Sequence, residues 1–310
     1  MERQAHDLDV DGTRIRLWAR VPDGAETAVL LVHGATYPGR VVFDLDVPGA
    51  DATYSWLADV AARGRAAVAV DLRGYGDSDR PPAMDAPADE NPPPARADVV
   101  VEDVRTALDH LRSRYDRTHL VGYSWGSLVC GRLLAAPHAP AVASLTQFAP
   151  VFRMDPTVVA RFDPGDPAPA YRTATRETVA ARWNDQVPDD ADPATWRGGP
   201  DDAVFDAFWT QFTATGQGSA DGIRAPNGTL LDLRETVDAA PYDPAAIAPP
   251  TLVVRGSEDP TATRADALGL YDALDGDREY AEVGGGTHFL PVEARRGALF
   301  DVVAGFHARV

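Results

Sequence analysis

Short apolar runs alternate along the chain with longer segments in which apolar residues recur every three or four positions. The short runs are mostly rich in Val, Leu and Ala, which is typical of buried strands. They lie at residues 28–32, 66–70, 118–121, 143–148, 251–254 and 279–283. The intervening segments predict helices near residues 56–61, 101–111, 124–136, 263–274 and 292–307. This alternation predicts a mainly parallel sheet with crossover helices, which is an α/β fold.

The alternation breaks off between residues 151 and 247, where Pro, Asp and aromatic residues replace the strand-like runs. We therefore predict a core made of residues 1–150 and 248–310, with a mostly helical insertion at residues 151–247. Four aromatic residues fall on one face of a helix expected in this insertion: Phe205, Phe208, Trp209 and Phe212. They either form a small core of the insertion or roof a pocket that selects an apolar substrate.

The most informative local motif is Gly122-Tyr123-Ser124-Trp125-Gly126, between a predicted strand and a predicted helix. A serine on such a sharp turn has a strained backbone, and small residues two positions away on either side relieve crowding. The turn lifts the hydroxyl clear of the sheet. It also directs the Trp125 amide, at a helix N-terminus, toward negative charge that develops on an attacked carbonyl. Ser124 is therefore a candidate nucleophile.

A serine hydroxyl needs a neighbouring base, and the base needs a carboxylate that fixes its tautomer. His288 follows the predicted strand 279–283 and a triple-glycine loop, so it leaves the sheet at the same edge as Ser124. Asp259 follows the strand 251–254 and leaves at that edge too. Its neighbour Glu258 is the alternative, but is expected to point elsewhere. These positions predict a relay of Ser124, His288 and Asp259.

A second amide for the developing negative charge is expected from the loop His33-Gly34-Ala35-Thr36, which follows the strand 28–32. A loop that leaves a strand end beside Ser124 can place its amide next to that of Trp125. Ala35 is the expected donor. His33 is either a second catalytic imidazole or a residue that orders this loop through hydrogen bonds, and we favour the second interpretation.

Together these motifs resemble the α/β-hydrolase family over most of the chain. The matching segments are His33-Gly34, Asp71 to Ser78, Gly122 to Gly126, Gly256 to Asp259 and Thr287-His288. The resemblance implies an eight-stranded, mostly parallel sheet flanked by helices, with a helical cap at the insertion. It also implies the triad Ser124, Asp259 and His288, in the chain order of that fold, and an oxyanion hole formed by the backbone amides of Ala35 and Trp125.

The activity expected from this resemblance is hydrolysis of a small or medium carboxylic ester through an acyl-enzyme. Epoxide hydrolases and haloalkane dehalogenases of this fold carry Asp as nucleophile, so Ser124 disfavours both. The stretch Gly122 to Ser127 is similar to that of proline iminopeptidases, whereas residues 33–39 differ from their oxyanion segment. Aminopeptidase, amidase or C–C bond hydrolase activity on the same triad stays open. A receptor that binds a ligand without catalysis is an alternative of another class.

Composition narrows the choice of partners. The chain has 29 basic and 47 acidic residues, a formal net charge of -18, and no lysine. This charge repels phosphate backbones and anionic lipids, so nucleic acid is not an expected partner. The expected hydrolase activity instead implies a small-molecule substrate, with an apolar portion that lies under the cap. The lysine-free acidic composition fits either biased coding DNA or adaptation to high salt. The oligomeric state is not predicted.

Several common features are missing from the sequence. No apolar segment is long enough to span a bilayer, and residues 1–11 lack the apolar core of a signal peptide, so a cytoplasmic location is expected. Zinc motifs, cysteine clusters and phosphate-binding loops are also absent, so neither a metal nor a cofactor is expected. Cys130, the one cysteine, is predicted to be a small buried residue.

Overall fold

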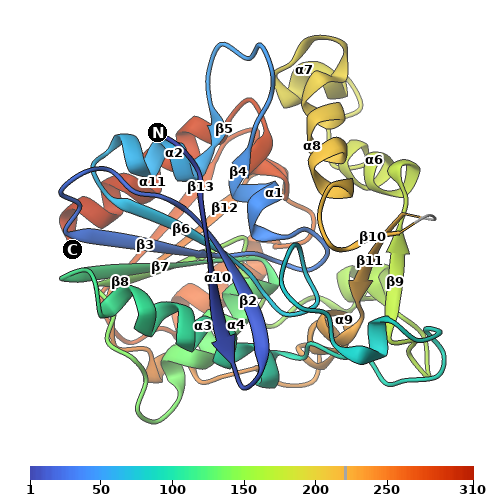
Figure 1. Ribbon diagram of the computed structural model, residues 1–310, viewed down its shortest axis with the longest axis horizontal. Coiled ribbons are helices and arrows are strands. Elements are labelled where there is room, and N and C mark those ends of the chain that lie inside the picture. Colours follow the sequence, from blue (N-terminus) through green and yellow to red (C-terminus); the bar gives the residue numbers. More distant parts are fainter. Residues whose placement is uncertain (220–221) are drawn as a thin grey trace.

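An eight-stranded sheet runs through the centre of the computed structural model, which describes residues 1–219 and 222–310 (Figure 1). Its strand order is β1-β2-β6-β3-β7-β8-β12-β13. The strands are β1 (Gln4–Val10), β2 (Thr13–Arg20), β3 (Thr27–Val32), β6 (Ala66–Asp71), β7 (Arg117–Tyr123), β8 (Ser144–Phe148), β12 (Thr251–Gly256) and β13 (Arg278–Val283). Strand β2 pairs antiparallel with β1 and β6, and the pairs from β6 to β13 are parallel. The predicted mainly parallel α/β fold is confirmed.

The six predicted strands correspond to β3, β6, β7, β8, β12 and β13 to within two residues at either end. Their apolar runs arise because helices cover both faces of the sheet. Along β3 the side chains alternate, with Leu30 and Val32 in one buried cluster and Val29 and Leu31 in the other. The sheet therefore separates two apolar cores.

Strands β1 and β2 were not among the predicted runs. Strand β1 is mostly exposed and charged, so it lacks the apolar composition of the buried strands. The hairpin was nevertheless marked by its turn, Asp11-Gly12, in which both residues have positive φ, 52° and 81°. An Asp-Gly pair with that backbone suits the tight turn that joins two twisted antiparallel strands.

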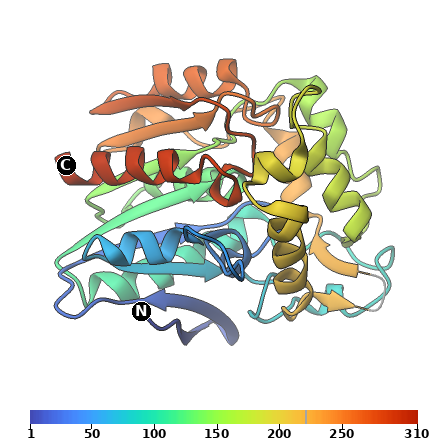
Figure 2. The same cartoon turned by 90° about the horizontal axis from the view of Figure 1, so that it is seen from above.

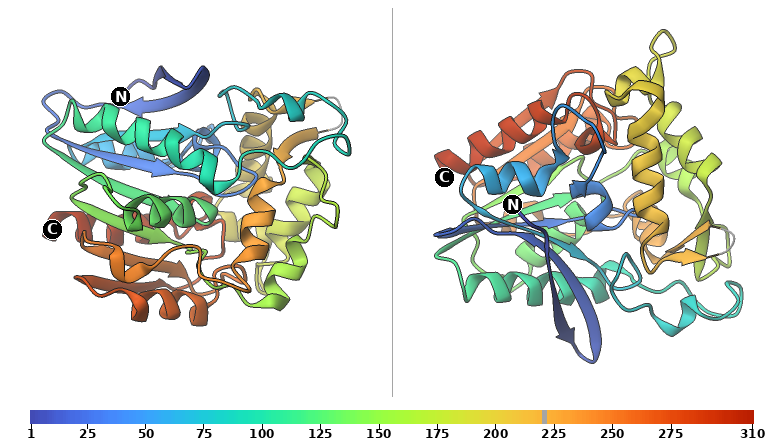
Figure 3. Two further views of the ribbon diagram at one scale, coloured as in Figure 1. Left: turned by 90° about the horizontal axis from the view of Figure 1, so that it is seen from below. Right: turned by 45° about the horizontal axis from the view of Figure 1, so that its top comes forward.

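The helices form a layer on each face of the sheet. On one face lie α3 (Ala97–Arg112), α4 (Trp125–Ala135) and α10 (Arg264–Ala273), and on the other lie α2 (Trp56–Ala62) and α11 (Arg296–Arg309) (Figures 2 and 3). The predicted helix 292–307 begins later than expected. Residues Leu290–Val292 form the 3-10 turn η5, and the helix proper starts at Arg296.

Short elements complete the core. These are α1 (Gly39–Phe43), β4 (Asp44–Leu45), β5 (Tyr54–Ser55) and η1 (Pro82–Met84). The 3-10 turn η4 (Pro244–Ala246) lies at the end of the segment 151–247. Strands β4 and β5 pair with each other in a two-stranded ribbon. In the described residues no helix is both long and apolar enough to cross a membrane.

The segment from residue 151 to residue 247 is mainly helical and gathers at one end of the sheet (Figures 1 and 2). Its helices are α5 (Pro156–Val159), η2 (Ala160–Phe162), α6 (Arg176–Asn184), α7 (Pro193–Arg197), η3 (Pro200–Asp202), α8 (Ala203–Thr213) and α9 (Gly228–Glu235). The expectation that strands disappear here was wrong. Strands β9 (Tyr171–Ala174), β10 (Gly218–Ser219) and β11 (Gly222–Pro226) form a small antiparallel sheet, too short and too polar to show as apolar runs.

The aromatic residues of α8 attach this segment to the core. Phe208 contacts the rings of Tyr37 and Trp183, with centroids 5.2 and 5.4 Å apart, and Trp183 stacks on Phe289 at 4.6 Å. Tyr37 and Phe289 belong to the loops at the end of the central sheet. The aromatic face of α8 is therefore neither a separate small core nor a pocket roof, but part of one of the two apolar clusters.

Candidate active site

Ser124 lies at the turn between β7 and α4, where its backbone has φ 55° and ψ -124°. These angles are unfavourable for a residue with a side chain, because Cβ crowds the neighbouring peptide groups. The turn is held by hydrogen bonds from the Ser124 amide to the Phe148 carbonyl, 2.9 Å, and from the Ser127 amide to the Ser124 carbonyl, 2.8 Å. The local conformation is therefore fixed by the surrounding backbone.

Glycines allow three backbone segments to meet at this turn. A Cβ atom on Gly126 would lie 2.4 Å from the carbonyl oxygen of His33, and one on Gly122 would lie 2.7 Å from that of Gly126. A Cβ on Gly34 would lie 2.7 Å from that of Ser124. Larger residues at Gly34 or Gly126 would push the loop after β3 away from Ser124, and a larger residue at Gly122 would push away the first turn of α4. These contacts explain the small residues of the motif.

His288 and Asp259 meet Ser124 from the ends of β13 and β12. The imidazole Nε2 is 2.9 Å from Ser124 Oγ, and Nδ1 is 2.8 Å from Asp259 Oδ2. All three residues are buried. Because an ionised carboxylate only accepts hydrogen bonds, Nδ1 donates to Asp259, and Nε2 is left to accept from the serine hydroxyl. The structure thus brings the three predicted side chains into one hydrogen-bonded chain.

The carboxylate of Asp259 is further oriented by its own loop. Its Oδ1 atom accepts from the amides of Thr261, at 2.8 Å, and Ala262, at 3.0 Å. Glu258, the alternative, is exposed and accepts from the hydroxyl of Ser257 at 2.8 Å. The loop therefore directs Asp259 toward the imidazole and Glu258 toward solvent.

The two predicted amide donors flank Ser124. Ala35 lines the same small cavity as Ser124, and Trp125 is the first residue of α4. Among residues 1–219 and 222–310, no protein acceptor binds either amide. Trp125 is held by its indole, which donates to Asp232 Oδ2 at 2.9 Å. The unbonded Trp125 N–H lies at the positive end of α4, and Ala35 lies in the lining of the same cavity as Ser124. Two N–H groups of this kind can stabilise an anion.

His33 has the contacts of a residue that orders the loop. Its Nε2 atom accepts from the Leu72 amide at 3.1 Å, so Nδ1 is the protonated nitrogen and donates to the Gly34 carbonyl at 2.7 Å. Burial lowers the pKa of His33 to about 4, which keeps the ring neutral near pH 7. Both ring nitrogens are thus engaged with backbone groups.

The loop also carries a strained residue, Thr36, with φ 85°. A β-branched residue rarely adopts positive φ. The side chain of Arg172, from β9, donates to the Thr36 hydroxyl. Arg172 is itself held by the carbonyl of Pro226, at 2.9 Å, and by Asn227 Oδ1, at 3.1 Å. A residue of the 151–247 segment therefore stabilises the loop that carries Ala35.

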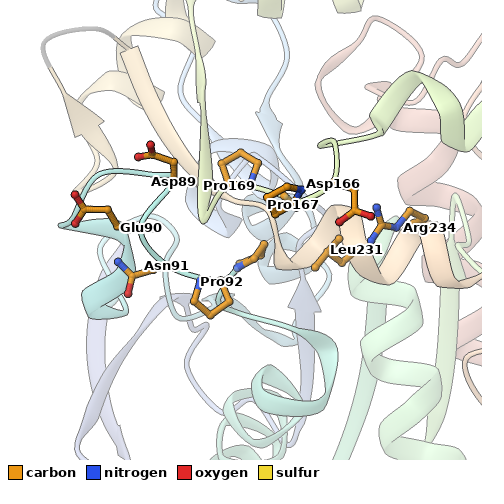
Figure 4. A pocket seen from close by; sticks show the side chains of 11 residues that line it. Asp89, Glu90, Asn91, Pro92, Asp166, Pro167, Pro169, Leu231 and Arg234 are labelled. Carbon is orange, nitrogen blue, oxygen red and sulfur yellow. The ribbon is translucent and has the colours of Figure 1, made fainter.

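The cavity at Ser124 is almost closed, with about 10 Å³ open to the centre of a water molecule. Its lining comes from both parts of the chain: Ala35, Tyr37, Tyr123, Ser124, Phe162, Arg182, Leu230, Leu233, Thr261 and His288. A larger groove, with about 480 Å³ open to the centre of a water molecule, lies outside this cavity. It is formed by residues 89–93 of the proline-rich loop, residues 166–169 and α9 (Figure 4). Leu231 and Arg234 of α9 line that groove, whereas Leu230 and Leu233 line the cavity. Helix α9 therefore separates the two spaces.

The sequence analysis did not identify several residues that lie at or near this cavity. Arg182, on α6, lines the cavity. Gln186, in the turn after α6, does not line it, but its Oε1 atom accepts from the His288 amide at 3.0 Å. Nothing distinguishes either from an ordinary surface residue, because the signal for a site lay in the loops that follow strands. Cys130 is buried, as predicted. In the described part of the chain, no group of three or more His, Cys, Asp or Glu could hold a metal ion.

The strain at Ser124 predicts a difference in stability between two variants. Ser124→Gly should be more stable than Ser124→Ala by about 1 kcal/mol, because glycine tolerates positive φ. Urea unfolding of both variants measures the difference. Ser113, exposed at the end of α3 with φ -76°, serves as the control, and there the glycine variant should be the less stable. Equal stability of the two Ser124 variants would contradict a strained turn.

Comparisons with known proteins agree with this architecture. A model of the alpha/beta hydrolase family matches residues 29–302. A curated protein from Siraitia grosvenorii, epoxide hydrolase 2, is 33% identical over 109 residues, which is 34% of this chain and 27% of that protein. The chain therefore matches only about a quarter of the length of this curated relative.

Solved structures are similar over nearly the whole chain. An E-2-(acetamidomethylene)succinate hydrolase has a TM-score of 0.67 at 16% identity and covers 98% of this chain and 99% of its own. A serine hydrolase involved in carbazole degradation has a TM-score of 0.65 at 16% identity, with full coverage of both chains. An epoxide hydrolase from Vigna radiata has a TM-score of 0.67 at 18% identity, covering 100% and 99%. At these identities the similarity is one of fold.

Proposed function

Because this chain belongs to the alpha/beta hydrolase family, we propose that it is a serine hydrolase that cleaves a small carboxylic ester through an acyl-enzyme. The observation that carries the proposal is the hydrogen-bonded chain from Asp259 through His288 to Ser124, with distances of 2.8 and 2.9 Å. It contains a nucleophile, a base within reach of its proton, and a carboxylate that orients the base.

In the first half of the reaction, Ser124 Oγ attacks the ester carbonyl while His288 Nε2 takes the hydroxyl proton. The amides of Ala35 and Trp125 donate to the oxyanion that forms, and Asp259 stabilises the charged imidazole. When the tetrahedral intermediate collapses, His288 gives the proton to the departing alkoxide. The alcohol leaves, and the acyl group stays on Ser124.

In the second half, His288 takes a proton from a water molecule that attacks the acyl-enzyme. The same two amides stabilise the second oxyanion, and collapse returns the proton to Ser124 Oγ and releases the acid. Each step uses groups of this chain and water. The proton moves between only two atoms of the protein, Nε2 and Oγ, which are already in hydrogen-bonding contact.

The epoxide hydrolases among the similar proteins suggest a second reaction, which the nucleophile disfavours. A carboxylate that opens an epoxide gives an ester, which water can cleave. A serine that opens an epoxide would give an ether, and this link is not cleaved by a base and an oxyanion hole. Ser124 therefore supports acyl transfer.

We also propose that residues 151–247 act as a cap over a hydrolase core made of residues 1–150 and 248–310. Support comes from Phe162, Arg182, Leu230 and Leu233, which line the cavity at Ser124 from this segment. The hydrogen bond from the His288 amide to Gln186 joins the cap to the relay. Substrate selection would then reside largely in the cap.

A substrate panel tests the proposed function. Short alkyl and p-nitrophenyl esters should be hydrolysed, whereas aminoacyl anilides and styrene oxide should not. A fluorophosphonate should label the wild type, and mass spectrometry should locate the label on Ser124. Turnover of anilides alone would identify an amidase or peptidase. Correctly folded protein that neither turns over nor is labelled would instead be a ligand-binding receptor.

A further inference from the structure

Arg182 is a positive charge in the cavity that contains Ser124 and His288. We propose that Arg182 selects an ester whose acyl part carries a second, ionised carboxylate. This inference rests on the proposed ester hydrolysis and adds a substrate class to it.

The guanidinium of Arg182 has no partner that would neutralise it. Within the residues that the structure describes, no carboxylate lies within 4.0 Å of it, and its close contact is with the ring of Phe162, 4.7 Å from the centroid. By contrast, Arg176 on the same helix pairs with Asp206. Arg182 is half-buried and lines the cavity of Ser124 and His288, so its unpaired charge faces the space that a substrate would enter.

A second cation strengthens the positive field in this region. Arg172 is half-buried and is bonded to neutral oxygens only, those of Pro226, Asn227 and Thr36. Burial lowers its pKa to about 10, and the positive charge of Arg182 contributes to the lowering, yet the group remains charged near pH 7. The two guanidiniums thus influence each other with no neutralising carboxylate bonded to either. Asp259, the buried acid of the site, is bonded to His288.

The order of the two half-reactions and the lining of the cavity indicate which part of the substrate Arg182 meets. The acyl part stays on Ser124 in the closed space until water releases it, whereas the alcohol must leave. The walls near Arg182 include the apolar side chains of Phe162, Leu230 and Leu233. With about 10 Å³ free, these side chains must move apart before an acyl group can enter. A short apolar spacer between the ester carbonyl and a terminal carboxylate then matches the apolar character of the walls, and the planar guanidinium can bind that carboxylate through two hydrogen bonds. Monoesters of short dicarboxylic acids have this form.

A matched pair of substrates tests the inference. Monoethyl succinate carries the carboxylate, and ethyl 4-methylpentanoate replaces it with an uncharged group of the same shape. The wild type should have the higher kcat/KM for monoethyl succinate, despite the net charge of -18. Arg182→Met should lower the ratio of the two kcat/KM values by about 10- to 100-fold, as expected for a lost hydrogen bond to a charged group. Arg182→Lys should lower this ratio less than Arg182→Met does, because lysine keeps the positive charge.

Arg153→Met is the control, because Arg153 is exposed, belongs to the same segment and carries the same charge. This variant should keep the wild-type ratio. A wild type that prefers the uncharged ester, or an Arg182→Met ratio equal to that of the wild type, would overturn the inference while leaving ester hydrolysis intact. Preference for 3-(butanoyloxy)propanoate, which carries the carboxylate on the alcohol side, would overturn the assignment to the acyl part. Failure to hydrolyse any of these esters would count against the proposed function itself.

Discussion

Replacing Ser124 by alanine is expected to lower kcat for the best ester by about a million-fold. The reason is that the hydroxyl forms the covalent bond to the acyl group. In the residues that the structure describes, the His288 ring is hydrogen-bonded to no hydroxyl other than that of Ser124. The variant should still fold, because the Ser124 contacts that hold the turn are made by its backbone amide and carbonyl. Steady-state kinetics with the purified variant measure the loss, and circular dichroism checks the fold.

Ser113→Ala provides the comparison for this variant, because Ser113 is an exposed serine at the end of α3. It should keep wild-type kcat and wild-type labelling by the fluorophosphonate. More than about one per cent residual activity in folded Ser124→Ala protein, free of wild-type contamination, would mean that another group starts the reaction.

Asp259→Asn is expected to lower kcat by about ten thousand-fold. The asparagine side chain is nearly the same size, so its oxygen can still accept from the amides of Thr261 and Ala262, which now bond to Oδ1. Its NH2 group would then face Nδ1 of His288 and donate to it. The ring proton would move to Nε2, and that nitrogen could no longer accept the proton of Ser124. Binding of substrate should change much less than kcat.

Glu258→Gln makes the same chemical change one residue earlier, on a side chain that faces solvent. Its kcat should stay within about twofold of the wild type, since surface substitutions away from a site have small effects. If the two variants lost activity equally, the carboxylate of the relay would be wrongly assigned. NMR of the His288 ring protons in both variants would report the tautomer directly.

The core of this fold could be predicted because its signals are local. A strand buried on both faces requires a run such as Ala66–Asp71, and a sharp turn to a helix requires glycines such as Gly122 and Gly126. Loops that follow parallel strands emerge at one edge, so Ser124, Asp259 and His288 could be expected near one another. The hairpin β1–β2 was not predicted because β1 is mostly exposed and charged residues interrupt the apolar residues of β2, although the turn Asp11-Gly12 marked it.

The structure of residues 151–247, the proposed cap, could not be predicted in the same detail. Its strands are two to five residues long, and what fixes them is packing against the core rather than a repeating pattern. Arg172 and Arg182 lie ten residues apart on different elements, and only the folded chain shows that they approach the loop of Thr36 and the cavity of Ser124. A single arginine has no spacing rule that would distinguish it from its neighbours.

The nearly closed cavity at Ser124 affects the rate at which a substrate or inhibitor can bind. With about 10 Å³ free, an incoming molecule must wait until side chains such as Phe162 and Leu233 move aside. Association should then fall below the diffusion limit, and its rate should level off at high ligand concentration, where opening becomes the slow step. Progress curves recorded with a covalent inhibitor would show this as a saturating rate of inactivation.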